Sequence, residues 1–244
     1  MLMHRYAKKA AMVCFIGATL GWVNYASAGV VIGSTRVIYR ESKDEVTVKL
    51  TNNNSSPVLV QSWIDKGEKN ISPEKLTVPF ILTPPINRMD PGKGQTLRIS
   101  YIGTPALPTD KESVYWLNVL EVPAKQKGVQ DKSRLNIAFR TRIKIFYRPE
   151  GLSGNANAAP KDLVWKIRDG ALQVMNPTPY NVNLGIIYYK DNGKNHQIEG
   201  DMVISGGTQT YKFKDTVKVS NLSMLSYTAI NDYGAFVKYN ANDH

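Results

Sequence analysis

The sequence contains one cysteine, Cys14, which lies in an apolar stretch close to the N-terminus. The rest of the chain therefore has no thiol, no disulfide and no cysteine-based metal site. A folded region built without disulfides has to be held together by its hydrophobic core.

Histidine is almost as scarce, and catalytic motifs are missing. Only His4, His196 and His244 occur, with no pair at metal-ligand spacing, and His196 lies in a polar, turn-like stretch typical of a surface histidine. Neither a Gly-rich phosphate loop nor a Gly-x-Ser-x-Gly motif is present, and the acidic residues form no paired motif. We therefore expect a protein that is not an enzyme and that uses no cofactor, metal or ATP.

Long apolar runs are also missing, apart from one at the N-terminus. His4, Arg5, Lys8 and Lys9 precede an apolar run from Ala10 to Val23, and Ala26-Ser27-Ala28 follows it. A basic head, a short apolar run and a small-x-small site are typical of a secretory signal, and the run is short for a membrane span. Residues 1–28 are thus predicted to be a signal peptide that is cleaved before Gly29, so the mature protein is expected to be exported.

The formal net charge is +11, but the chain has no compact run of lysine and arginine. Three of these charges lie in residues 1–28, which leaves about +8 on the 216 residues that follow. The basic residues are spread through alternating segments, as on solvated strand faces, and nucleic-acid binding is not expected.

The remaining sequence is rich in short runs of β-branched and aromatic residues, separated by Asn, Gly, Pro and Asp. This pattern predicts an all-β fold of two immunoglobulin-like sandwiches, because two series of about seven strands are present. The first series is Arg36–Tyr39, Glu45–Leu50, Val58–Ile64, Leu76–Leu82, Gln95–Tyr101, Val114–Val122 and Arg134–Tyr147. The second is Leu163–Ile167, Leu172–Met175, Asn181–Tyr189, Asp201–Ser205, Thr208–Phe213, Leu225–Ile230 and Ala235–Tyr239.

The boundary between the two domains is predicted near Pro149. Gly151–Pro160 shows no periodicity and is expected to be a loop at the start of the second domain. The predicted domains are therefore residues 29–149 and residues 150–244.

The segment from Arg134 to Tyr147 is unusually long for a strand in a domain of this size. Its 14 residues would span roughly 46 Å if extended, more than twice a typical strand. One face is apolar (Leu135, Ile137, Phe139, Thr141, Ile143, Ile145) and the other is mainly polar. Periodicity alone favours a strand whose apolar residues all face their own core, whereas the surplus length suggests an end that serves another chain.

Six ordered motifs resemble those of the periplasmic pilus chaperones of the chaperone–usher pathway. The longest reads L-P-T-D-K-E-S-V-Y-W-L-N-V-L-E-V-P-A over residues 107–124. The others are Thr35–Tyr39, Thr83-Pro84-Pro85, Arg142–Pro149, Asn176–Tyr180 and Ile230–Gly234. The short connection at residues 124–133 and the lack of a cysteine pair resemble the short-loop subfamily.

The resemblance implies a chaperone that binds, folds and caps pilus subunits by lending them a strand and delivers them to an outer-membrane usher. It implies an L-shaped arrangement of the two domains and a donor strand with Leu135, Ile137 and Phe139. Arg36 and Lys144 match the residues that hold the carboxylate at the subunit's C-terminus. Glu112, Arg148 and Asp232 match a charge cluster between the domains. The lent strand is also compatible with a self-capping dimer of the free protein.

Two other interpretations compete with the chaperone. A secreted immunoglobulin-like adhesin or sugar-binding module would share the β-sandwich pattern. A polymerising adhesin, however, would carry a detachable N-terminal donor strand or lack its own last strand, and 235–239 is expected to complete the second domain. A secreted hydrolase on a β scaffold is disfavoured by the missing catalytic groups.

Overall fold

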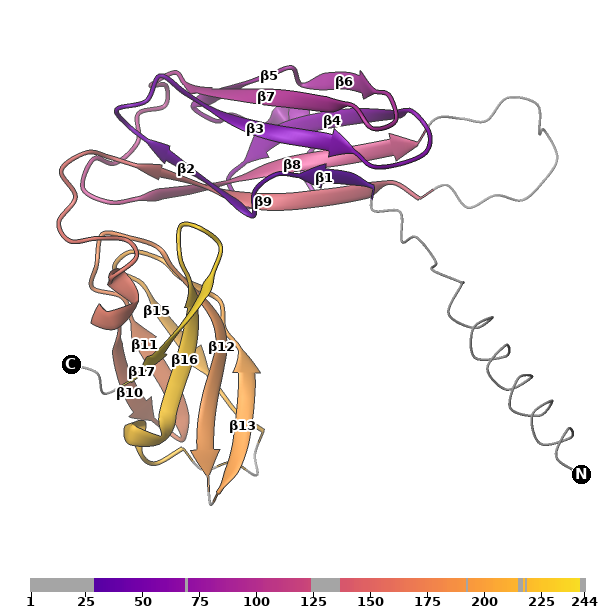
Figure 1. The fold of residues 1–244 in the computed structure, drawn as a ribbon. Helices are drawn as coiled ribbons and strands as arrows, with labels where there is room; N and C mark the ends of the chain where they lie inside the picture. Colours follow the sequence, from indigo (N-terminus) through magenta and orange to yellow (C-terminus); the bar gives the residue numbers. More distant parts are fainter. Residues whose placement is uncertain are drawn as a thin grey trace, which may run out of the picture.

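The computed structural model describes residues 29–68, 70–123, 137–191, 193–214, 217 and 219–241. The predicted signal peptide, Leu135 and the connection at residues 124–133 lie outside these residues. The described chain forms two β-sandwiches in an L-shaped arrangement, joined after the last strand of the first sandwich (Figure 1). None of the helices in the described ranges is long and apolar enough to cross a membrane.

The first sandwich packs a four-stranded sheet against a five-stranded sheet. The four-stranded sheet has the order β1 (Val30–Ile32), β3 (Glu45–Asn52), β7 (Gly94–Tyr101), β5 (Phe80–Thr83). The five-stranded sheet has the order β2 (Arg36–Arg40), β9 (Phe139–Arg148), β8 (Ser113–Pro123), β4 (Val58–Asp65), β6 (Ile86–Met89). All pairings in the two sheets are antiparallel except β2 with β9, which is parallel.

The core of the first sandwich follows from alternation along the strands. Alternate residues of β3, β7, β8 and β9 are apolar and point between the sheets, and Leu50, Leu97, Leu117 and Ile145 are fully buried there. An aromatic cluster of Tyr39, Phe80, Tyr101, Tyr115 and Tyr147 fills the end nearest the second domain.

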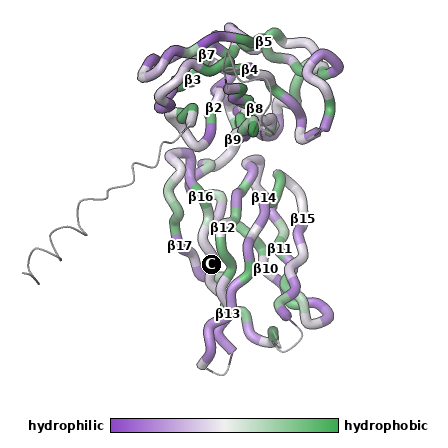
Figure 2. The backbone as a smooth tube through the Cα atoms, turned by 90° about the vertical axis from the view of Figure 1, so that its right-hand side faces the viewer, coloured by the Kyte–Doolittle hydropathy of each residue, from purple (hydrophilic) through white to green (hydrophobic). Residues whose placement is uncertain are grey.

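The second sandwich has a three-stranded sheet and a five-stranded sheet. The first has the order β10 (Val164–Arg168), β11 (Ala171–Met175), β15 (Thr208–Tyr211). The second has the order β13 (Lys194–Glu199), β12 (Val182–Asp191), β16 (Leu225–Ile230), β17 (Phe236–Asn240), with β14 (Met202–Val203) on β12. Figure 2 shows the strands of both sheets beneath the first domain, with β17, β16 and β12 to the left of β10, β11 and β15.

Three strands were not predicted from the sequence. β1 is only three residues long, β6 follows directly after Pro84-Pro85, and β13 (K-N-H-Q-I-E) is a polar edge strand without apolar alternation. Short 3-10 helices also occur at Pro73–Lys75 (η1), Ala159–Asp162 (η2) and Leu222–Met224 (η3). The strand predicted at residues 76–82 accordingly begins only at Phe80, after η1.

The long predicted strand at residues 134–147 is shorter in the structure. β9 begins at Phe139 and ends at Arg148, and residues 137 and 138 lie outside it. β9 holds an interior position between β2 and β8, so its hinge end is hydrogen-bonded on both sides. β2 pairs only with residues 144–148, so β2 leaves the Phe139 half of β9 uncovered.

Candidate functional site

Two cations lie side by side where the domains meet. The parallel pairing of β2 with β9 places Arg36 directly opposite Lys144. Their sequence neighbours Val37 and Ile145 point into the core, so alternation directs both charged side chains to the outer face of the sheet. The sequence had singled out these two residues, and the structure brings them together.

The second domain supplies an oxygen to each cation. The Nζ atom of Lys144 donates a hydrogen bond to Oδ1 of Asn183 over 2.6 Å, and Nη1 of Arg36 donates to the backbone oxygen of Ile230 over 3.1 Å. Asn183 and Ile230 are themselves partners across β12 and β16. Asn183 and Ile230, which are adjacent in the second domain, therefore accept hydrogen bonds from Lys144 and Arg36, which are adjacent in the first.

The surroundings disfavour the charged forms of both cations. Burial lowers the pKa of Lys144, the charge of Arg36 lowers it further, and Asp201 opposes both effects. Burial also lowers the pKa of Arg36, against the attraction of Asp232 and Glu112. Nε of Arg36 is buried and has no hydrogen-bond partner within the described residues. An anion placed here would therefore gain unused donors and positive charge.

A pocket of about 380 Å³ opens beside the two cations. Its lining is Thr35, Arg36, Trp116, Arg142, Ile143, Lys144, Asn183 and Ile230. Three of these side chains are cationic and none is acidic, which suits a carboxylate.

The third cation of the pocket, Arg142, was not predicted as a site residue. It forms an ion pair with the buried Asp65, and its Nε donates to Oδ1 of Asn118 over 3.0 Å. Nδ2 of Asn118 in turn donates to Oδ2 of Asp65 over 2.7 Å, and the guanidinium lies over the Trp116 ring. This network holds Arg142 on the outer face of the sheet. The sequence could not predict the network, because it depends on how β4, β8 and β9 align with one another.

Glu112, Arg148 and Asp232 meet at the hinge. Nε of Arg148 donates to Oε1 of Glu112 over 2.7 Å, and its Nη1 and Nη2 donate to the two carboxylate oxygens of Asp232 over 2.8 and 2.9 Å. Asn181 adds a backbone hydrogen bond to Oε2 of Glu112 over 3.0 Å. The geometry thus joins β9 of the first domain to the β16–β17 loop of the second.

Burial and the partner charges have opposite effects on the pKa of Glu112, and also on the pKa of Arg148. Burial raises the pKa of Glu112, although the charge of Arg148 works against it. For Arg148 burial acts to lower the pKa, but the hydrogen bonds and charges of Asp232 and Glu112 outweigh it and raise the value. The guanidinium therefore stays charged with its two carboxylate partners.

Two of the three predicted donor residues, Ile137 and Phe139, lie just before and at the opposite end of β9. Ile137 is 50% exposed and Phe139 is 64% exposed, whereas Ile143 and Ile145 on β9 are buried. Leu135, the third predicted donor residue, lies outside the described residues. One strand therefore carries an exposed apolar end and, five residues from Phe139, the cation Lys144.

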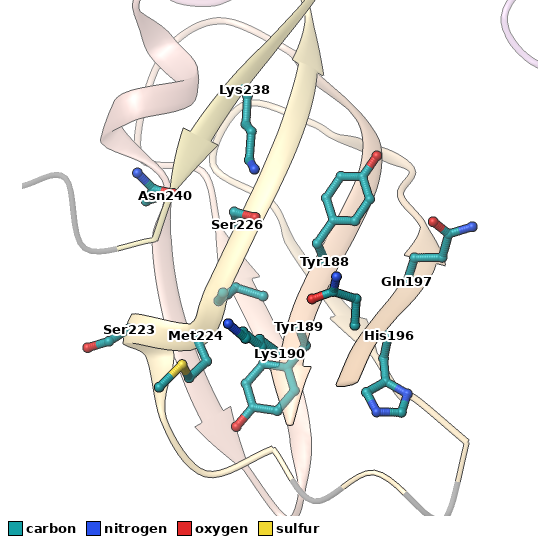
Figure 3. Close-up of a pocket in the computed structure, with 12 residues that line it drawn as sticks. Tyr188, Tyr189, Lys190, His196, Gln197, Ser223, Met224, Ser226, Lys238 and Asn240 are labelled. Carbon is teal, nitrogen blue, oxygen red and sulfur yellow. The ribbon is translucent and has the colours of Figure 1, made fainter. Parts of the chain in front are cut away.

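A wider hollow of about 560 Å³ lies on the second domain, away from the domain junction (Figure 3). Figure 3 shows Tyr188, His196 and Lys238 among the side chains around it, on β12, β13 and β17. Within the described ranges no cluster of three or more His, Cys, Asp or Glu side chains could hold a metal ion. The lining of this hollow contains no Asp or Glu side chain. The pocket beside Arg36 and Lys144, with its three cations, is therefore the better candidate for a binding site.

The fold and the site define a protein of two β-sandwich domains with a pocket lined by cations at their junction. The family models of "Pili and flagellar-assembly chaperone, PapD N-terminal domain" and "Pili assembly chaperone PapD, C-terminal domain" match residues 29–153 and 158–241. The chain therefore belongs to the PapD family of pilus-assembly chaperones.

Individual relatives agree with the family models. "Chaperone protein FimB/FhaD" of Bordetella pertussis is 44% identical over 220 residues, which is 88% of each chain. "Probable fimbrial chaperone YadV" of Escherichia coli K12 is 40% identical over 96% of this chain and 97% of its own length. A chain of the SafA pilin–SafB chaperone complex of Salmonella enterica is 27% identical, covers 87% of this chain and 96% of that one, and superposes with a TM-score of 0.72.

Proposed function

We propose that this protein caps pilus subunits by donor-strand complementation, in which the β9 end lends its strand and apolar side chains to an unfinished subunit. Leu135, Ile137 and Phe139 enter the subunit, while Arg36 and Lys144 bind the carboxylate at its C-terminus. The observation that carries this proposal is the placement of both features on one strand. Phe139 and Lys144 are five residues apart, roughly 17 Å along an extended chain.

This spacing gives the cation pair a role in register. Side chains alternate between the two faces of a strand, so a slip of one residue would turn every lent side chain the wrong way. A C-terminal carboxylate held at Lys144 fixes where the subunit strand ends, and hence which subunit residue meets Phe139. In this proposal Arg36 adds a planar donor fork and Lys144 a point charge.

The charge cluster of Glu112, Arg148 and Asp232 sets the angle between the domains in this proposal, and so the shape of the cleft. The cluster contributes to the arrangement of the domains more than to stability, because a buried ion pair gives little net stability over an apolar replacement.

The protein works as a periplasmic binding protein and not as an enzyme in this proposal, after cleavage before Gly29. The mature domains are residues 29–149 and 150–244, the partners are pilus subunits and an outer-membrane usher, and no ATP is used. The short-loop subfamily and a self-capping dimer of the free chaperone remain predictions that rest on the exposed strand and on residues 124–133.

The anchor is tested with Lys144→Ala and Arg36→Ala, each co-produced in the periplasm with a pilus subunit of the same organism. We expect both variants to fold, by circular dichroism, and to co-purify at least about tenfold less subunit, because a buried charge pair is lost. Lys190→Ala, which removes a lysine from the far end of β12, is the matched control. Normal recovery of subunit by both anchor variants would refute the anchor.

A further inference from the structure

The two anchor cations are held from the second domain by atoms that carry no full charge. Lys144 donates to the side-chain amide oxygen of Asn183, and Arg36 donates to the backbone oxygen of Ile230. Asn183 is buried, and its position on β12 is fixed by pairing with Ile230 on one side and Met202 on the other. Its oxygen therefore lies at a defined place.

A neutral acceptor and a charged acceptor would act differently at this place. An amide oxygen satisfies one of the three Nζ donors of Lys144 and leaves the positive charge intact for an incoming anion. A carboxylate of the same size would neutralise the ammonium and occupy it before a ligand arrived. The cluster at the hinge shows the second arrangement, because Arg148 is saturated there by Glu112 and Asp232.

We propose that Asn183 is a positioning residue for subunit capture: its neutral amide oxygen orients Lys144 toward the pocket while keeping the ammonium charge available for the subunit's C-terminal carboxylate. This inference rests on the proposed function and adds a residue of the second domain to the anchor. It also makes capture depend on how the two domains meet, because Lys144 is oriented by an atom across the junction.

The proposal predicts an order of effects that a merely structural role would reverse. If Asn183 only stabilised the domain junction, Asn183→Asp would keep or strengthen the bond to Lys144, and Asn183→Ala would be the more damaging change. If Asn183 keeps the charge available, Asn183→Asp is the more damaging change for capture, although the isolated protein unfolds at an unchanged or higher temperature.

The experiment measures subunit recovery and thermal unfolding for wild type, Asn183→Ala, Asn183→Asp and the control Asn195→Asp. The control makes the same substitution on β13, at an exposed position paired with Lys190. We expect Asn183→Asp to recover about tenfold less subunit or worse, Asn183→Ala about two- to fivefold less, and the control to match wild type.

The outcomes separate this inference from the function on which it rests. Recovery by Asn183→Asp that equals or exceeds that of Asn183→Ala overturns the positioning role, while loss of capture by Lys144→Ala still upholds the anchor. Failure of wild type to recover any subunit overturns the proposed function and the inference with it. A lower unfolding temperature of Asn183→Asp together with lost capture also overturns the inference, because it indicates a structural role.

Discussion

The two ends of β9 belong to one strand and one apolar face, yet their burial is opposite. Ile145, near the hinge, is fully buried, whereas Phe139, at the far end, is 64% exposed. The residues opposite them on β8 differ in the same way: Ile145 faces Tyr115, and Phe139 faces Glu121. Glu121 accepts hydrogen bonds from the backbone nitrogen of Val30 over 2.7 Å and from Nδ2 of Asn54 over 2.8 Å. The sandwich is therefore closed by polar groups before it reaches Phe139.

The comparison explains how one alternating pattern serves two purposes. Alternation determines which face of a strand is apolar, but the layer beneath determines whether that face is buried. At the hinge end the aromatic cluster around Tyr147 and Phe80 supplies this layer. At the free end no such layer is present within the described residues, so the free energy of burying the side chains, roughly 1.5–3 kcal/mol for each large one, remains available to a partner.

The largest expected effect comes from placing a charge inside β9, at Ile145, or just before its free end, at Ile137. Ile145→Asp should unfold the first domain, with a loss of about 4 kcal/mol or more, because it buries a carboxylate without a partner. Ile137→Asp should leave the unfolding temperature nearly unchanged and abolish subunit recovery. Thermal unfolding by circular dichroism and co-purification provide the two measurements. If Ile137→Asp destabilises the protein as much as Ile145→Asp, the free end is part of the core and lends nothing.

The next largest effect concerns the outer face of the same strand. Arg148→Ala should destabilise the protein by about 3–5 kcal/mol, because it leaves the buried Glu112 without its counter-charge. Arg140→Ala, at the exposed end of β9, should change stability by no more than about 0.5 kcal/mol. Urea unfolding measures both, and small-angle scattering should report a changed domain arrangement for Arg148→Ala only. If Arg148→Ala and Arg140→Ala have equal free energies of unfolding, the charge cluster at Arg148 is as exposed to solvent as the free end of β9.

The sequence predicted most of the fold because alternation and turn residues are local signals. Fourteen of the seventeen described strands overlap a predicted strand, and the three missed ones are short, polar or preceded by two prolines. The strands that carry Arg36 and Lys144, β2 and β9, were also found. Their parallel pairing was not, because register depends on residues far apart in the sequence.

The candidate site was predictable only in part, for the same reason. Arg36, Lys144, Glu112, Arg148 and Asp232 were singled out through the family resemblance and lie together in the structure. Arg142 with Asp65, and Asn183, were missed, because their importance arises from side chains that meet across strands or domains. A weak signal existed for Asn183: it is a polar residue within the apolar run V-N-L-G-I-I.

A smaller effect is expected when one exposed side chain is shortened. Phe139→Ala removes no core contact, so stability should stay within about 0.5 kcal/mol of wild type. Subunit binding should weaken by roughly 10- to 100-fold, as the loss of about 1.5–3 kcal/mol of apolar burial implies. Thr141→Ala, at the next position on the same face of β9 and also exposed, provides the control. A competition assay between variants for limiting subunit measures the difference, and equal competition would remove Phe139 from the donor set.

The smallest effect is a dependence on pH that only the hinge half of β9 should show. Burial and the charge of Arg36 lower the pKa of Lys144, so its ammonium is lost at a lower pH than that of an ordinary lysine. Subunit capture should therefore weaken as the pH rises from about 7 toward the usual lysine pKa of about 10.4, while the apolar contribution of Phe139 stays constant. Stability of the free protein should change in the opposite direction over this window, because the folded state binds fewer protons than the unfolded state there and gains stability as the pH rises. Lys144→Arg keeps its charge throughout and should flatten the capture profile. If wild type and Lys144→Arg lose capture in parallel, Lys144 does not titrate in this range, and the loss belongs to another group.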